Sequence, residues 1–217
     1  MDIEHLGHAC LRVHHDGDTI LLDPGVFSPG LVEQLGTSTG PGAVLVTHAH
    51  PDHLDPDLVP LLERVVGPGG VLAEAGAAQV VREAGGSVTE LVVGAEHRLG
   101  GVTVQVVGGR HAVIHPDVPR IGNVGLLLRA GGVTLFHPGD SYETTPDGVD
   151  VLALPLNAPW AKVAETVEFV RAVGPRVVLP VHDALLQPER REVYLAHVRN
   201  LGGAAVHDPA RDGVLHA

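Results

Sequence analysis

Short apolar stretches, several of which alternate apolar with polar residues, recur along this chain and are typical of β-strands. Glycine, proline or aspartate bounds most of them, as is common where strands end. The pattern predicts strands at residues 3–6, 10–14, 19–22, 43–47, 87–93, 102–107, 124–129, 133–136, 151–154 and 176–180.

Four segments with helical spacing lie between these strands, and they are predicted at residues 56–65, 75–84, 161–173 and 188–200. In the third, Val163, Val167 and Val170 recur at helical intervals, and the fourth begins at Pro188, which suits a first helical turn. Because strands and helices are mixed in both halves, the sequence predicts a layered α/β or α+β structure. Its 217 residues fit a single domain over residues 1–217.

Composition and charge narrow the class of protein. Hydrophobic residues make up 44% of the chain, yet no apolar run approaches the length of a membrane span and no secretory leader is evident, so we expect a cytoplasmic protein without a membrane partner. The net charge of −12, with no offsetting basic cluster, disfavours nucleic acid as a partner. Cys10 is the single cysteine, so a metal site would have to use histidine and carboxylate ligands.

The segment "THAHPDH", residues 47–53, follows a predicted strand and precedes a predicted helix, with Asp55 as N-cap and Pro56 at the first helical position. In an extended segment His48 and His50 point to the same side, whereas Asp52 and His53 lie where the chain turns. A single His-x-His is often only a solvated loop. The full pattern with aspartate at the fifth place indicates metal ligation, with room for two adjacent ions.

This HxHxDH motif after a strand resembles the hallmark of the metallo-β-lactamase-fold hydrolase superfamily. Further motifs occur in the superfamily's order: "LLDPG" with Asp23, "GGRHAVIH" with His111, "FHPGDS" with Asp140 and "VVLPVHD" with His182. The resemblance spans nearly the whole chain and implies the four-layered αβ/βα sandwich of that superfamily.

The resemblance also implies roles for these residues. The first metal would be held by His48, His50 and His111, and the second by Asp52, His53 and His182. Asp140 would bridge the two ions, and Asp23 would be a supporting residue.

Imidazole and carboxylate ligands suit two divalent ions, Zn²⁺ above all, with Mn²⁺ or Fe²⁺ as alternatives. Two such ions close together lower the pKa of a shared water and stabilise the oxyanion formed by its attack. Asp52 is the candidate catalytic residue, since it would help to orient the attacking hydroxide.

Two histidines near the third motif leave alternatives open. His111 and His115 both follow the predicted strand, and His111 is preferred as the third ligand because it comes directly after Gly108 and Gly109. His115 is then a candidate for the substrate pocket. His137, three residues before Asp140, is either a packed or supporting histidine or a catalytic one, and it is also a candidate for substrate contact.

The opening "IEHLGHACLRV" resembles the small bacterial branch of the superfamily that includes ascorbate-phosphate lactonases, and this resemblance would place His8 near the metals. A turn histidine bonded to backbone is the alternative. Asn157, Trp160 and Arg120 are further candidates for substrate contact. The alternatives are that Asn157 caps a loop, that Trp160 packs in the core and that Arg120 lies at the surface.

The sequence therefore predicts a dinuclear metal-dependent hydrolase that acts on an ester, lactone, amide or phosphodiester of a small molecule. A phosphodiester nuclease of the same fold and a non-catalytic metal-binding scaffold are the alternatives. The acidic charge disfavours the nuclease, and the complete set of ligand-type residues disfavours the scaffold. The sequence is compatible with a homo-oligomer.

Overall fold

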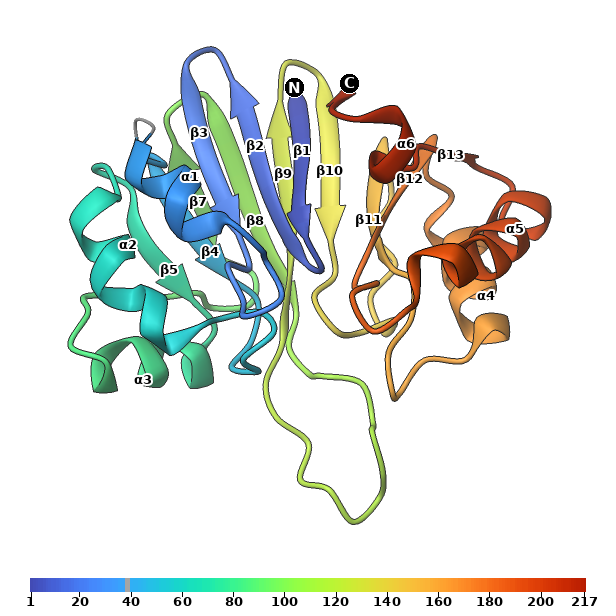
Figure 1. Ribbon diagram of the computed structural model, residues 1–217, viewed down its shortest axis with the longest axis horizontal. Helices are drawn as coiled ribbons and strands as arrows, with labels where there is room; N and C mark the ends of the chain where they lie inside the picture. The colour runs from blue at the N-terminus through green and yellow to red at the C-terminus, as the bar shows by residue number, and fades with distance from the viewer. Residues whose placement is uncertain (38–39) are drawn as a thin grey trace.

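The computed structural model describes residues 1–37 and 40–217. Within these residues the strands form two seven-stranded sheets, which face each other at the centre of the molecule (Figure 1). The first sheet has the order β14-β1-β2-β3-β4-β5-β6, and the second has the order β13-β12-β11-β10-β9-β8-β7.

Both sheets combine an antiparallel part with a parallel part. In the first, β1 (Asp2–Gly7), β2 (Cys10–His15) and β3 (Asp18–Leu22) are antiparallel, and β4 (Ala43–Val46), β5 (Gly70–Ala73) and β6 (Thr89–Glu90) continue in parallel. The C-terminal β14 (Leu215–His216) pairs with β1 at the edge, where Ile3 lies opposite Leu215.

The second sheet repeats this arrangement. Its antiparallel strands are β7 (Glu96–Leu99), β8 (Val102–Gly108), β9 (Val124–Ala130) and β10 (Val133–His137). Its parallel strands are β11 (Val151–Pro155), β12 (Val177–Val181) and β13 (Ala205–Val206). The long loop 109–123, between β8 and β9, extends from the edge of the sheets at the bottom of Figure 1.

Helices cover the outer faces of both sheets (Figure 1). The first sheet carries α1 (Leu31–Thr37), the 3-10 helix η1 (Pro56–Leu58), α2 (Val59–Val65) and α3 (Ala75–Glu83). The second sheet carries α4 (Val163–Val173), η2 (Pro188–Arg190), α5 (Arg191–Leu201) and the short α6 (Pro209–Asp212).

Three clusters of buried apolar side chains hold these layers together. The central cluster lies between the sheets and includes Leu11 and Leu45 from the first and Val104 and Leu126 from the second. The other two clusters lie between each sheet and its helices. The order helix, sheet, sheet, helix confirms the predicted four-layered αβ/βα sandwich.

The predicted strands and helices are found with shifted ends, apart from one segment. Of the strand predicted at 87–93, only Thr89–Glu90 pairs as β6, because Val92 and Val93 are exposed in a turn before Gly94, whose φ is +87°. Asp55 caps η1 as predicted, and its carboxylate accepts a hydrogen bond from the amide of Asp57. The described residues contain no helix long and apolar enough to cross a membrane.

Candidate metal centre

The candidate ligands lie where strands end, at one edge of the two sheets. Thr47 to His53 follow β4, Asp140 follows β10, and His182 follows β12. Asp23 follows β3, and His111 lies in the long loop after β8. β4 belongs to the parallel part of the first sheet and β12 to that of the second, and both end at this edge. Residues far apart in sequence therefore meet there.

Two groups of side chains bring potential metal-ligating atoms together. One group contains His48, His50, His111 and Asp140, and the other contains His8, Asp52, His53 and His182. Within each group, one ligating atom of every residue lies within 4.8 Å of the others. The structure thus gathers all seven predicted ligands and adds His8 to the second group.

Asp140 lies between the two groups. Its Oδ1 is 3.1 Å from Nε2 of His53, and its Oδ2 is 3.2 Å from Nε2 of His182 and 3.4 Å from Nε2 of His111. One carboxylate therefore faces histidines of both groups, as a bridging ligand would.

Asp23 orients the histidines that come from the first sheet. Its Oδ1 accepts a hydrogen bond from the Thr47 amide (2.8 Å), and its Oδ2 accepts one from Thr47 Oγ1 (2.7 Å). Nδ1 of His53 also lies 2.7 Å from that Oδ2. Asp23 and His53 are both buried, so this network fixes the His53 ring with Nε2 toward Asp140.

The hydrogen bonds of the other ligands select the tautomer that suits a metal. Nδ1 of His111 donates to the Ala112 carbonyl (2.7 Å), and Nδ1 of His182 donates to the Asn157 carbonyl (2.8 Å). With the proton on Nδ1, Nε2 carries a lone pair whenever the ring is neutral, as metal ligation requires. Nε2 of His111, His182 and His53 and Oδ1 of Asp140 are all buried without a hydrogen-bond partner.

His48 and His50 face one another across the first group. Thr47 Oγ1 gives its own proton to Asp23, so it accepts one from Nδ1 of His48 at 3.1 Å. Nε2 of His48 is thereby left bare, 3.1 Å from Nδ1 of His50. Two ring nitrogens this close need a proton or a cation between them.

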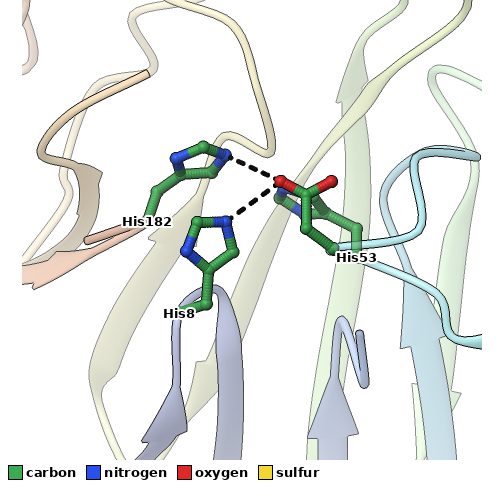
Figure 2. Close-up of side chains that lie close together, drawn as sticks. His8, His53 and His182 are labelled. Carbon is green, nitrogen blue, oxygen red and sulfur yellow. Dashed lines mark hydrogen bonds and ion pairs between the residues drawn. The ribbon is translucent and has the colours of Figure 1, made fainter. Parts of the chain in front are cut away.

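Figure 2 shows His8 and His182 directed at one carboxylate oxygen, Oδ2 of Asp52, and His8 differs from His182 in the bond at its other ring nitrogen. Its Nδ1 accepts a hydrogen bond from the Ala184 amide (3.2 Å), so the ring proton lies on Nε2, which is 3.1 Å from Asp52 Oδ2. Nε2–H therefore donates to the Asp52 carboxylate and has no lone pair for a metal. His8 holds Asp52 in place from the β1–β2 turn.

Charges in the cluster shift the pKa values of its members. Burial disfavours the charged form of Asp140, yet His53 and His182 hold its pKa well below the usual range. Burial likewise opposes protonation of His182, but Asp140 and Asp52 raise its pKa to about 9. Burial lowers the pKa of His48 well below its usual value. Burial also opposes protonation of His53, but Asp140 and Asp23 raise its pKa well above the usual value. Near neutral pH the metal-free site thus combines an ionised Asp140 with protonated His53 and His182 and a neutral His48.

The backbone is constrained at the same positions. His8, Asp23 and His182 have φ values of 50°, 44° and 58°, and among the described residues only Asp16 is another non-glycine residue with positive φ. Such conformations cost energy and are typical of functional sites. Gly25 lets the chain approach the ligand loop, because a Cβ there would lie 1.9 Å from the Asp52 carbonyl oxygen.

Trp160 contacts the site directly. Its Nε1 donates to Asp140 Oδ2 (2.9 Å), and its ring lies edge to face with Tyr142 at a centroid distance of 4.9 Å. Trp160 is therefore both a wall beside the cluster and a partner of the carboxylate between the two groups.

The remaining candidates lie outside the two groups. Asn157 contributes its backbone carbonyl, to His182. His137 is buried and packed, with Nε2 donating to the Ala9 carbonyl (3.2 Å) and Nδ1 accepting from the Gly139 amide. His115 is exposed in the long loop, where its Nδ1 accepts from the Asp117 amide.

Arg120 also has partners within the chain. Its Nε donates to the His111 carbonyl, and its guanidinium is paired with Glu143. This residue ties the long loop down beside His111, and its charge is matched by a carboxylate.

Thr47 and Asn123 are site residues that sequence reasoning missed. Asn123 Oδ1 accepts from the Asp140 amide (2.9 Å), and its Nδ2 donates to the Pro138 carbonyl (2.9 Å), which fixes the turn that presents Asp140. A Cβ on Gly139 would lie 2.2 Å from that Oδ1, so this turn needs glycine. Thr47 could have been found by its place directly before the histidine motif, whereas Asn123 carries no such signal.

The chain is similar in sequence to known proteins. Residues 2–182 match the family model of the beta-lactamase superfamily domain, a span that includes both groups of ligand-type residues. The chain belongs to this superfamily. Among its relatives, Protein Rv0786c of Mycobacterium tuberculosis is 38% identical, covering 93% of this chain and 92% of that protein. A UPF0173 metal-dependent hydrolase of Carboxydothermus hydrogenoformans is 26% identical over 84% of each chain.

The fold of this superfamily member is also found among solved structures. The metallo-beta-lactamase fold protein YhfI from Bacillus subtilis superimposes with a TM-score of 0.75 at 14% identity, covering 99% of each chain. The predicted superfamily and its fold are thereby confirmed. Membership and the His/Asp groups together support a metal-dependent hydrolase.

Proposed function

We propose that this chain is a metal-dependent hydrolase with two metal ions. His48, His50 and His111 would hold the first ion, and Asp52, His53 and His182 the second, with Asp140 between them. The observation that carries this proposal is the set of buried atoms without hydrogen-bond partners: Nε2 of His53, His111 and His182 and Oδ1 of Asp140. Leaving such atoms unpaired is costly, and divalent metal ions would satisfy all four.

The donor set fits divalent ions of intermediate softness. It consists of imidazole nitrogens and carboxylate oxygens, which suit Zn²⁺ and also accommodate Mn²⁺ or Fe²⁺. Cys10 lies in the apolar cluster behind the first sheet, where burial raises its thiol pKa to about 12. When bound, two ions supply a water of lowered pKa and positive charge against a developing oxyanion.

The surrounding residues have separate tasks in this proposal. Asp52 is the more accessible carboxylate, with 22% of its side chain exposed against 4% for Asp140, so it faces arriving water and substrate. His8 Nε2–H engages Oδ2 of Asp52, which orients the carboxylate so that its other oxygen can accept a proton from water. Trp160 restrains Asp140 from the opposite side.

The proposed site needs both halves of the chain. Four of its ligands come from the loop after β4 in the first sheet, and the other three come from loops after strands of the second sheet. Neither sheet alone holds a complete ligand set for either ion. We therefore propose that residues 1–217 function as a single domain.

Metal analysis combined with a hydrolysis screen tests this function. We expect about two metal ions per chain and chelator-sensitive cleavage of an ester, a lactone or a bis-phosphodiester, restored by adding Zn²⁺ or Mn²⁺. His50→Ala should lose metal and activity, whereas His115→Ala, a change of the same kind outside the groups, should keep both. Protein that stays metal-free and inert after Zn²⁺ and Mn²⁺ addition would refute the proposal.

A further inference from the structure

An open cleft of about 590 Å³ adjoins the metal centre. One wall is the long loop, with Val113 and Ile114, and the other is formed by Trp160 and Tyr142. A smaller hollow lined by His50 and His111 shares Val113 and Ile114 with this cleft. The cleft therefore lies beside the candidate ligands.

Part of each wall of the cleft is apolar. Val113 and Ile114 are 55% and 41% exposed, although burial of such side chains is favourable. The Trp160 indole is held in place by its hydrogen bond to Asp140, so its ring presents a fixed surface. Exposed apolar side chains that converge beside a polar centre are typical of a ligand-binding site.

Charge around the cleft argues against an anionic ligand. Lys162, the cation among the described residues that line it, is paired with Glu165 at 2.9 Å, and Glu143 is paired with Arg120. Glu143 and Glu165 both line the cleft, and the whole chain carries a net charge of −12. A phosphate or carboxylate on the substrate would meet carboxylates and no unpaired cation of the lining.

We propose that this cleft binds the apolar chain of an uncharged ester or lactone, with the acyl group directed to the metal centre. This inference rests on the proposed hydrolase function. Hydrolysis would add water across the acyl C–O bond, giving a carboxylic acid and an alcohol, or a hydroxy acid from a lactone. An uncharged substrate differs from the phosphorylated one that the resemblance to ascorbate-phosphate lactonases implies.

A matched series of esters tests the inference with the zinc-loaded protein. From p-nitrophenyl acetate to the octanoate we expect KM to fall at least tenfold with little change in kcat, because each buried methylene contributes roughly a threefold gain. The p-nitrophenyl monoester of suberic acid, which ends the same eight-carbon chain in a carboxylate, should show at least a tenfold higher KM than the octanoate. A KM independent of chain length, or a preference for the suberate, would overturn the inference.

Substitutions test whether the dependence of KM on ester chain length arises in this cleft. The double variant Val113→Ser with Ile114→Ser should remove most of the dependence of KM on ester chain length. Val32→Ser is the matched control, since Val32 is also exposed but lies on α1, away from the cleft. Equal loss in both variants, or no loss in the double variant, would argue against this binding surface.

Binding without hydrolysis separates the two proposals. Trp160 is the chain's only tryptophan, so its fluorescence reports occupancy of the cleft. Octanamide should shift its emission at concentrations at least tenfold lower than the monoamide of suberic acid. If this preference is seen but no ester, lactone or phosphodiester is cleaved, the cleft assignment stands and the hydrolase proposal fails. If hydrolysis occurs without the preference, the cleft assignment fails alone.

Discussion

The two sheets supply the candidate metal centre in different ways. The first gives His48, His50, Asp52 and His53 from one loop after β4, and Asp23 is the common partner of Thr47 and His53. The second gives His111, Asp140 and His182 from three separate segments, and each of these has its own partner.

The partners of the two histidines are backbone carbonyls, and the partners of Asp140 are side chains, one at its backbone amide and one at its carboxylate. Ala112 and Asn157 accept from His111 and His182, whereas Asn123 and Trp160 contact Asp140. A change at the common partner of the first sheet should therefore disturb several ligands at once. A change at one partner of the second sheet should disturb a single ligand. Asp140 is the exception, because it faces histidines from both sheets.

Asp140→Ala should have the largest effect. Loss of the carboxylate removes the contact between the two groups, so we expect metal content to fall to one ion or fewer per chain. We also expect kcat/KM to fall by more than about 100-fold, beyond the range for residues that only support ligands. Metal analysis and ester hydrolysis measure this, with His115→Ala as control. Two ions per chain in Asp140→Ala would contradict the assignment.

Asp23→Ala should come next and should test the common partner directly. The variant leaves the buried Thr47 amide and the His53 ring without their acceptor, so we expect metal affinity to fall roughly 10- to 100-fold for both ions. We also expect stability to fall by about 1–3 kcal/mol. Competition with a metal chelator and urea unfolding measure the two effects.

The matched change in the second sheet is Asn123→Ala, which removes the acceptor of the Asp140 amide. It should weaken metal binding less than Asp23→Ala, since the carboxylate still contacts Trp160. Equal losses in the two variants would show that the sheets do not differ in this way.

The sequence predicted the contiguous part of the site better than its surroundings. The spacing of residues 47–53 alone points to metal, whereas Asp140 and His182 were selected by resemblance, because no local pattern links single residues at distant strand ends. Arg120 and Asn157 show the limit of such reasoning. The Arg120 guanidinium is engaged by Glu143, and Asn157 acts through its backbone, so residue type alone could not predict either contact.

The fold shows the same division between regular and irregular segments. The apolar alternation at 102–107 found β8, because seven residues in a half-buried strand leave a clear period of two. The two-residue strands β13 and β14 and the four-residue α6 are too short to show any period, and α1, β5 and β7 were also missed. Val92 and Val93 misled the prediction because apolar residues at this edge face solvent.

The stability of the metal-free protein should depend moderately on pH. Burial opposes the charge on His182, but Asp140 and Asp52 raise its pKa to about 9 from 6.5. A group whose pKa is raised by folding stabilises the fold fully below pH 6.5, and this stabilisation is lost as pH rises toward 9. The lowered pKa values of His8, His48 and His50 act below pH 6.5. Burial opposes the charge on His53 too, but Asp140 and Asp23 raise its pKa well above 6.5, so deprotonation of His53 adds to the loss at higher pH.

We therefore expect chelated protein to lose about 2–3 kcal/mol of stability between pH 6.5 and 9 through His182. Zinc-loaded protein should not show this loss, because metal ligation requires neutral imidazole, and metal affinity therefore increases as His182 loses its proton. Urea unfolding at several pH values, with and without zinc, measures the difference. A parallel decline in both forms would mean that the His182 proton does not compete with metal.

Trp160→Phe should have the smallest effect and should separate the two contacts of this residue. Phenylalanine keeps an aromatic wall for the cleft but loses the Nε1 hydrogen bond to Asp140, whose net worth is about 1 kcal/mol. We expect kcat to fall about three- to tenfold, while the dependence of KM on ester chain length persists and both ions remain bound. Ester kinetics and metal analysis distinguish loss of the hydrogen bond to Asp140 from loss of the aromatic wall of the cleft. If chain-length dependence vanished while kcat stayed constant, Trp160 would serve the cleft alone, and the second sheet would hold Asp140 through Asn123 without it.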